Sequence, residues 1–143
     1  MPASARITVD YRATGTPQPV HDAAVYILDL SSIALGSSID RISAELRAHM
    51  NVLRSNSSSS LILMSHMVPD VGVMRPEEEA MARLRDLSLF QLTNQRLIDM
   101  TELSTLVSNV TDSMGRLSVA KKVCSRSGDA AALEVRYQPF SSG

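Results

Sequence analysis

The sequence predicts a mainly α-helical protein, and three observations lead to this expectation. Apolar residues recur at steps of three and four over two long stretches, residues 38–54 and 76–123. Aromatic residues make up only 3% of the chain, while eight methionines supply flexible apolar bulk that suits helix contacts. The 143 residues are enough for one domain and too few for two comfortable ones.

The first 20 residues are rich in Ala, Ser, Thr and Pro and predict a flexible N-terminal segment. Within it, Ile7, Val9 and Tyr11 alternate with polar residues, which also fits a short strand near residues 6–11. A helical assembly region is expected over residues 21–123. At its start VYIL favours a strand by β-branching, but we expect a short helix over residues 21–35.

An amphipathic helix is predicted over residues 38–54. Ser37, followed by Asp40 three residues later, resembles a capping box at its start. Charged residues lie off its apolar stripe, as on a helix with one buried face. The stripe consists of Ile39, Ile42, Leu46, Met50 and Leu53.

A linker is expected over residues 55–75. The run SNSSSS is typical of a loop, because Ser and Asn side chains compete for backbone hydrogen bonds. Pro69, Gly72 and Pro76 fall within eight residues and argue against a long element.

A long helical region is expected over residues 76–123, since no Pro or Gly occurs between Pro76 and Gly115. Pro76 suits the first helical position, and the three glutamates that follow it complement the helix dipole. Met81, Leu84 and Leu87 form one stripe, but Leu89 and Leu92 lie on a shifted face. One bent helix and a helical hairpin with its bend near Thr93–Asn94 both fit this pattern.

The second half of this region carries an apolar stripe with the spacing of a coiled-coil seam, at steps of 3, 4, 3, 4 and 3 residues. Such a stripe is buried either in the core of its own domain or against another subunit, and both interpretations stay open. Its members are Met100, Leu103, Val107, Val110, Met114 and Leu117.

Residues 124–143 are expected to form a C-terminal tail. After the loop SRSGDAA, the stretch LEVRYQPF alternates apolar and polar residues and predicts a short strand near residues 132–137. If this strand paired with ITVDY near the N-terminus, the chain would instead be a small α+β domain.

Composition argues against several classes of function. The net charge of −1 gives no electrostatic footprint for nucleic acid. Cys124 is the single cysteine, and His21, His49 and His66 show no ligand spacing, so we expect no metal, no cofactor and no enzyme. We expect His49 to face solvent. No signal peptide and no membrane span are apparent, which predicts a soluble protein synthesised in the cytoplasm.

Two stretches resemble the inner-rod proteins of bacterial type III secretion systems. LGSSIDRISAELRAHMNVLRSN is similar to the first helix of that family. RPEEEAMARLRDLSLFQLTNQRLIDMTELSTLVSNVTDSMGRL is similar to its C-terminal helical region. The resemblance implies a structural subunit, exported without a cleaved signal into an envelope-spanning secretion complex. The tail after residue 118 departs from the family's pattern.

The expected function is therefore that of a non-enzymatic structural subunit that self-associates through helix packing, with protein partners and no nucleic acid. A cytosolic helical adaptor or chaperone that binds one protein partner through residues 100–117 is the alternative. The expected assembly interface consists of Met100, Leu103, Val107, Val110, Met114, Leu117, Ile39, Ile42 and Leu46.

Overall fold

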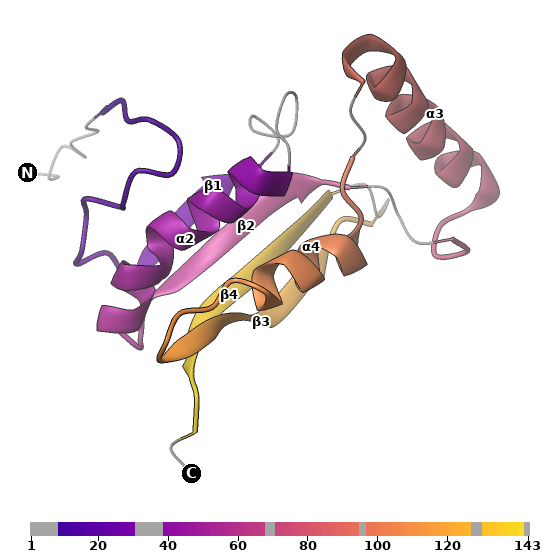
Figure 1. Ribbon diagram of the computed structural model, residues 1–143. Coiled ribbons are helices and arrows are strands. Elements are labelled where there is room, and N and C mark those ends of the chain that lie inside the picture. The colour runs from indigo at the N-terminus through magenta and orange to yellow at the C-terminus, as the bar shows by residue number, and fades with distance from the viewer. Residues whose placement is uncertain (1–8, 31–38, 68–70, 95–96, 127–129, 142–143) are drawn as a thin grey trace, which may run out of the picture.

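The computed structural model describes residues 9–30, 39–67, 71–94, 97–126 and 130–141 (Figure 1). Seven helices and strands lie in these parts of the chain. In chain order they are β1 (Val25–Asp29), α2 (Ile39–Ser55), β2 (Ser60–His66), α3 (Pro76–Thr93), α4 (Met100–Ser108), β3 (Gly115–Cys124) and β4 (Ala130–Pro139).

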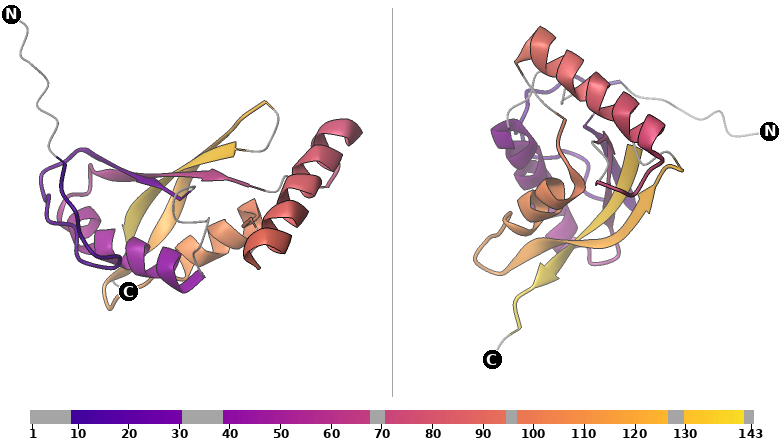
Figure 2. Two further views of the ribbon diagram at one scale, coloured as in Figure 1. Left: turned by 90° about the horizontal axis from the view of Figure 1, so that it is seen from above. Right: turned by 90° about the vertical axis from the view of Figure 1, so that its right-hand side faces the viewer.

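The four strands form one mixed sheet in the order β1-β2-β4-β3. β1 and β2 run parallel and are joined by the crossover helix α2, whereas β4 runs antiparallel to both of its neighbours. Figure 2 shows α2 and α4 together on one face of this sheet. The fold is therefore α+β, and the prediction of a mainly α-helical protein was wrong.

The core lies between the sheet and these two helices. Alternate residues of the central strands point toward the helices, and Leu61, Leu63, Leu133 and Val135 are fully buried. Burial of each such side chain stabilises the fold by about 1.5–3 kcal/mol relative to exposure. These strand residues hold the layers together, so the sheet contributes as much to the core as the helices do.

The first apolar segment forms a strand instead of the expected short helix in residues 21–35. β1 covers residues 25–29 of it, and residues 31–35 lie outside the described part of the chain. The β-branched residues of VYIL pair in register with β2, from Val25 opposite Ser60 to Asp29 opposite Met64. The helix expected over residues 38–54 corresponds to α2.

The expected linker over residues 55–75 was also wrong, because it contains β2. LILM is a continuous apolar run, which is the pattern of a central strand next to a parallel neighbour. Gly72 lies after this strand in the loop that leads to α3, and Pro69 lies outside the described residues. Their presence therefore said nothing about residues 60–66.

The long helical region expected over residues 76–123 is divided into two helices and a strand. α3 ends where a bend was considered, and Asn94 adopts a left-handed conformation with φ of 55°. Asp99 then starts α4, because its side chain accepts a hydrogen bond from the backbone N–H of Glu102 at 2.7 Å. The seam-like stripe therefore passes from α4 through a turn into β3.

The first and the last described segments of the chain contribute to the folded body. The N-terminal loop is held on α2, where the N–H of Gln18 donates to the carbonyl of Ala48 at 3.0 Å. Of the strand expected near residues 6–11, residues 6–8 lie outside the described part, and residues 9–11 form no strand. The strand expected near residues 132–137 lies within β4, which pairs with β2 and β3 and not with the N-terminal segment.

Candidate protein-interaction surface

Helix α3 stands apart from the sheet and its two covering helices (Figures 1 and 2). Among the described residues, no other helix or strand packs closely against it, and Ala82 is its only buried residue. Most helical stability in proteins comes from packing of an apolar face. α3 must therefore be held mainly by its own turns and by the loops at its ends.

Local interactions account for the bounds of α3. Pro76 occupies a position at the N-terminus where its missing N–H costs no hydrogen bond. The carboxylate of Glu79 contacts Arg83 one turn later, with 3.0 Å between Oε1 and Nε, and accepts a hydrogen bond from the N–H of Gly72. These two interactions lower the pKa of Glu79, the hydrogen bond from Gly72 more than the one from Arg83. At the C-terminus, Asn94 donates its N–H to the carbonyl of Phe90 at 2.8 Å.

Large apolar side chains are exposed around α3 and in the loop before it. Leu92 is 85% exposed, and four further residues of the helix are about half exposed. At 100° per residue these five positions spread over more than half of the helix circumference. A helix that is apolar on most sides is normally buried. The α3 surface, as we define it, consists of Val71, Val73, Met81, Leu84, Leu87, Phe90 and Leu92.

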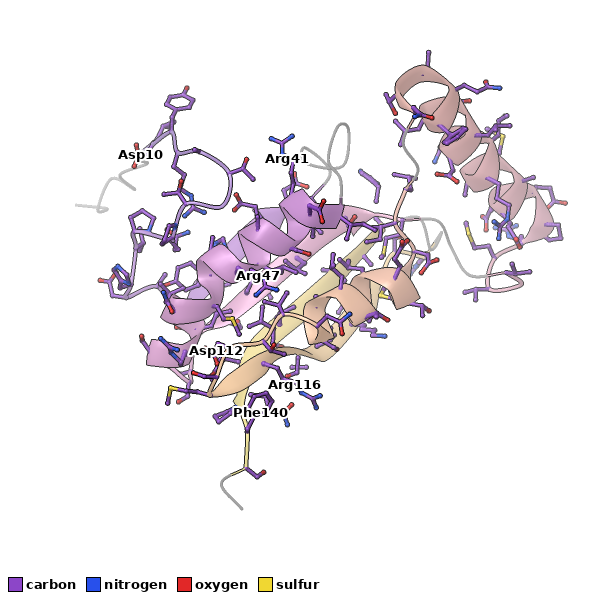
Figure 3. The ribbon with its side chains drawn as sticks, viewed as in Figure 1. Asp10, Arg41, Arg47, Asp112, Arg116 and Phe140 are labelled. Carbon is purple, nitrogen blue, oxygen red and sulfur yellow. The ribbon has the colours of Figure 1, made fainter. Side chains whose placement is uncertain are left out.

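Asp112 is the centre of a polar cluster at the turn before β3 (Figure 3). Its carboxylate accepts hydrogen bonds from Tyr137 at 2.7 Å and from the N–H groups of Met114 and Gly115 at 2.8 Å. Arg54 at the end of α2 forms an ion pair with it at 2.9 Å. These contacts, the hydrogen bond from Tyr137 first, hold the pKa of Asp112 below its usual value. The cluster joins three elements, which is a structural role.

His49 and Glu45 on α2 hold the N-terminal loop. His49 is buried, not solvent-facing as expected, and its Nδ1 lies 2.8 Å from the carbonyl of Glu45. Its Nε2 lies 3.2 Å from the side-chain nitrogen of Gln18, and burial lowers its pKa. Glu45 accepts a hydrogen bond from the N–H of Gly15 at 2.7 Å and contacts Arg12. The N-terminal loop covers the side of α2 that carries Glu45 and His49. The apolar periodicity of the helix could not reveal this contact.

The described residues hold no group of three His, Cys, Asp or Glu side chains that could bind a metal ion. Cys124 is exposed at the end of β3. No helix in the described part of the chain has the length and apolar character needed to cross a membrane. The features that stand out on this molecule are apolar surfaces.

The structure distributes the nine residues of the expected assembly interface over the fold. Met100 packs partly buried against the core, and Met114 and Ile39 are exposed. The other six belong to the single buried core of the fold. They are Leu103, Val107, Val110, Leu117, Ile42 and Leu46. Most of the stripe is therefore buried inside one chain, and a role of these nine residues in assembly stays a prediction.

The α3 surface is a candidate site that the predicted long helical region did not reveal. Its signal was present, because Met81, Leu84 and Leu87 lie on one face of the helix and Leu89 on a shifted one. A shift of this kind also fits a bend in a long helix. An apolar pattern without a single face, in a helix of 18 residues, instead indicates that more than one side must be covered.

Comparison with known proteins shows similarity to fungal transcriptional coactivators. The chain is 44% identical to the monodictyphenone cluster transcriptional coactivator mdpA of Emericella nidulans, over 99% of this chain and 30% of that protein. It is 46% identical to a transcriptional coactivator of Pseudocercospora fijiensis, over 93% of this chain and 37% of that protein. The chain thus spans about a third of the length of these relatives. No family model matches it.

Two solved structures with a similar fold are enzymes by their names. A pericyclic reaction enzyme matches with a TM-score of 0.67 and 17% identity, over 89% of this chain and 29% of its own. The mitomycin 7-O-methyltransferase MmcR matches with a TM-score of 0.58 and 18% identity, over 81% of this chain and 30% of its own. At this identity the likeness concerns the fold alone.

These findings overturn the resemblance to type III secretion inner-rod proteins. The relatives are fungal proteins named as transcriptional coactivators, and the fold is not that of a helical rod. The expectations of a secretion subunit, of a helical chaperone or adaptor, and of export into an envelope-spanning complex were therefore wrong. The chain is similar, over nearly its whole length, to one part of proteins that are named fungal transcriptional coactivators.

Proposed function

We propose that this chain is part of a transcriptional coactivator of a fungal secondary-metabolite gene cluster, and that it binds an activator protein through α3. A coactivator acts through a protein bound to DNA, so its working site is the nucleus and its interface is a protein surface. The near-neutral charge of the chain agrees with this, since direct DNA binding needs a basic surface.

The single observation that carries the proposal is the α3 surface. Exposed apolar patches of this kind mark protein interaction sites, and a helix in an apolar groove is a common mode of recognition. α3 already has its helical conformation, which reduces the entropy lost on binding. The relatives are named transcriptional coactivators. Because a coactivator works together with an activator of transcription, an activator is the partner that we propose.

We propose as well that the chain is not catalytic. The titratable side chains with shifted pKa values hold structural elements together, as Asp112 and His49 do. The solved structures neither support nor oppose the absence of catalysis, because the enzymes among them share the fold with this chain but little sequence.

A tethered reporter assay tests the proposal. The chain is fused to a heterologous DNA-binding domain in a fungal reporter strain, where we expect transcription to rise severalfold. The double variant Leu84→Asp/Leu87→Asp should lose this rise, because two charges in the α3 surface oppose burial against a partner. Ser88→Asp is the matched control, since it adds a charge to the same helix without removing an apolar side chain.

Two results would count against the proposal. One is a wild-type fusion that leaves transcription at the level of the DNA-binding domain alone. The other is full activity of the double variant while circular dichroism shows that it is folded.

A further inference from the structure

The two edges of the sheet differ in how they are protected. At the β3 edge, Lys121 and Lys122 are exposed, and the register with β4 shifts between Val119 and Lys121. Exposed lysines and β-bulges are devices by which proteins prevent another strand from adding to an edge. The β3 edge is therefore protected against the addition of another strand.

The β1 edge lacks both devices. The strand VYILD contains four apolar residues in succession and no Lys or Pro. Ile27 is 67% exposed and Val25 is 52% exposed. Among the described residues β1 pairs with β2 alone. An unprotected, apolar edge strand is a template for pairing with a further strand.

The face of the sheet opposite to α2 and α4 is apolar next to this edge. Ile27 lies opposite Ile62 of β2, and Met64 of β2 lies opposite Ala132 of β4, which in turn faces Val123 of β3. Met64 is 46% and Val123 is 56% exposed. The view from above shows α2 and α4 on the other side of the sheet, and no described helix on this face (Figure 2). We call this set, Val25, Ile27, Ile62, Met64, Ala132 and Val123, the second face.

Parallel strands are normally covered on both faces, and such strands therefore show continuous apolar runs instead of alternation. VYIL in β1 and LILM in β2 have this pattern, and these two strands are the parallel pair. Only one side of the pair is covered by described helices. The sequence of the strands is thus suited to a sheet that continues past β1.

We propose that a further α/β segment completes this sheet, with a strand that adds parallel to β1 and an amphipathic helix that covers the second face. Its chemistry follows from the site: a β-branched strand with a free edge, and a helix with one apolar side. This inference concerns a different surface from α3 and does not depend on binding through α3, but it rests on the proposal that the chain is part of a longer coactivator.

The source to which we commit is the part of the coactivator polypeptide that this chain does not span. The curated relatives are about three times longer than the matched part. The solved structures with this fold also match over only 29% and 30% of their own length. A second copy of the chain fits less well as the occupant. Its helices α2 and α4 already pack against its own sheet, so they are not available to cover the second face of another copy.

A fragment complementation experiment tests this inference. The 143-residue chain is mixed with the remaining part of the Emericella nidulans relative, produced as a separate polypeptide, and the complex is measured by sedimentation velocity. We expect a 1:1 complex and slowed amide exchange over Val25–Asp29. Ile27→Lys should weaken the complex at least tenfold, with Val25→Lys as a second variant. Leu92→Lys on α3 is the control, and it should leave the complex unchanged.

Loss of the complex can be distinguished from loss of folding, because both variants alter exposed side chains and circular dichroism reports whether they fold. A complex that Ile27→Lys weakens, and Leu92→Lys does not, supports the inference. Failure of the wild-type chain to form a complex would overturn it, as would a complex that folded Ile27→Lys and Val25→Lys proteins form equally well. Self-association through Ile27 that excludes the second polypeptide would also overturn it, because a second copy would then be the occupant.

Discussion

The hydroxyl of Tyr137 donates a hydrogen bond to Oδ1 of Asp112 across 2.7 Å and ties β4 to the turn that precedes β3. Tyr137→Phe removes this donor, which is the largest of the interactions that lower the pKa of Asp112. We therefore expect the pKa of Asp112 to rise toward its ordinary value, and the melting temperature to fall. Titration of the Asp112 carboxyl by NMR measures the first effect. Tyr11→Phe, at an exposed position, should leave both unchanged.

Gly115 begins β3 at a point where no side chain fits. A Cβ atom there would collide with the carbonyl oxygen of Gln138 and would lie 2.6 Å from the ring of Tyr137. We expect Gly115→Ala to reduce the free energy of unfolding by about 1–3 kcal/mol, as overpacking does. Urea unfolding of Gly115→Ala and of Ser118→Ala, at a half-buried position of the same strand, checks this. Equal stability of Gly115→Ala and wild type would contradict the close approach of the two strands.

His49 should make stability depend on pH. Burial lowers its pKa in the folded protein, so the unfolded chain binds a proton more readily than the folded chain. Its contribution is fully present above the unfolded value of about 6.5 and is lost as the pH falls below it. We expect the free energy of unfolding to fall between pH 7.5 and 5.5, and to fall less in His49→Gln. His66→Gln, which removes an exposed histidine, is the control variant.

Leu103 and Leu92 distinguish a core position from a surface position. Leu103 on α4 is fully buried, and Leu103→Ala should reduce the free energy of unfolding by about 2–5 kcal/mol. Leu92 on α3 is 85% exposed, and Leu92→Ala should stay within about 0.5 kcal/mol of wild type. Denaturant unfolding of both variants measures the difference. A large loss in Leu92→Ala at dilute concentration would show that α3 is packed within the single chain.

Periodicity predicted the helix over residues 38–54, because α2 has one buried face and a long run of regular spacing. It failed for residues 100–117, since the six stripe positions belong partly to α4 and partly to β3. The chain changes from helix to strand at the turn where the carboxylate of Asp112 accepts hydrogen bonds from two backbone N–H groups. Asp112 precedes Gly115 by three residues. Gly115 was visible in the sequence, but its role depends on Tyr137 and Gln138, which come more than 20 residues later.

Burial of β1 and β2 could not be assigned from local pattern either. A short apolar run such as LILM fits a buried strand and a buried helix segment equally well. What decides the matter is pairing with distant segments, Val25–Asp29 on one side and β4 on the other. The α3 surface required the fold as well, because only the packing of the other elements shows that this helix has no covering partner among the described residues.

Amide hydrogen exchange of the chain alone tests most directly whether the α3 surface is open for a partner. Local opening is easiest in elements with few buried apolar contacts. We predict that amides of α3 exchange at least about a hundredfold faster than those of the central strand β4, at every protein concentration. Protection of α3 equal to that of β4 would mean that its apolar residues are already covered, and would contradict the account.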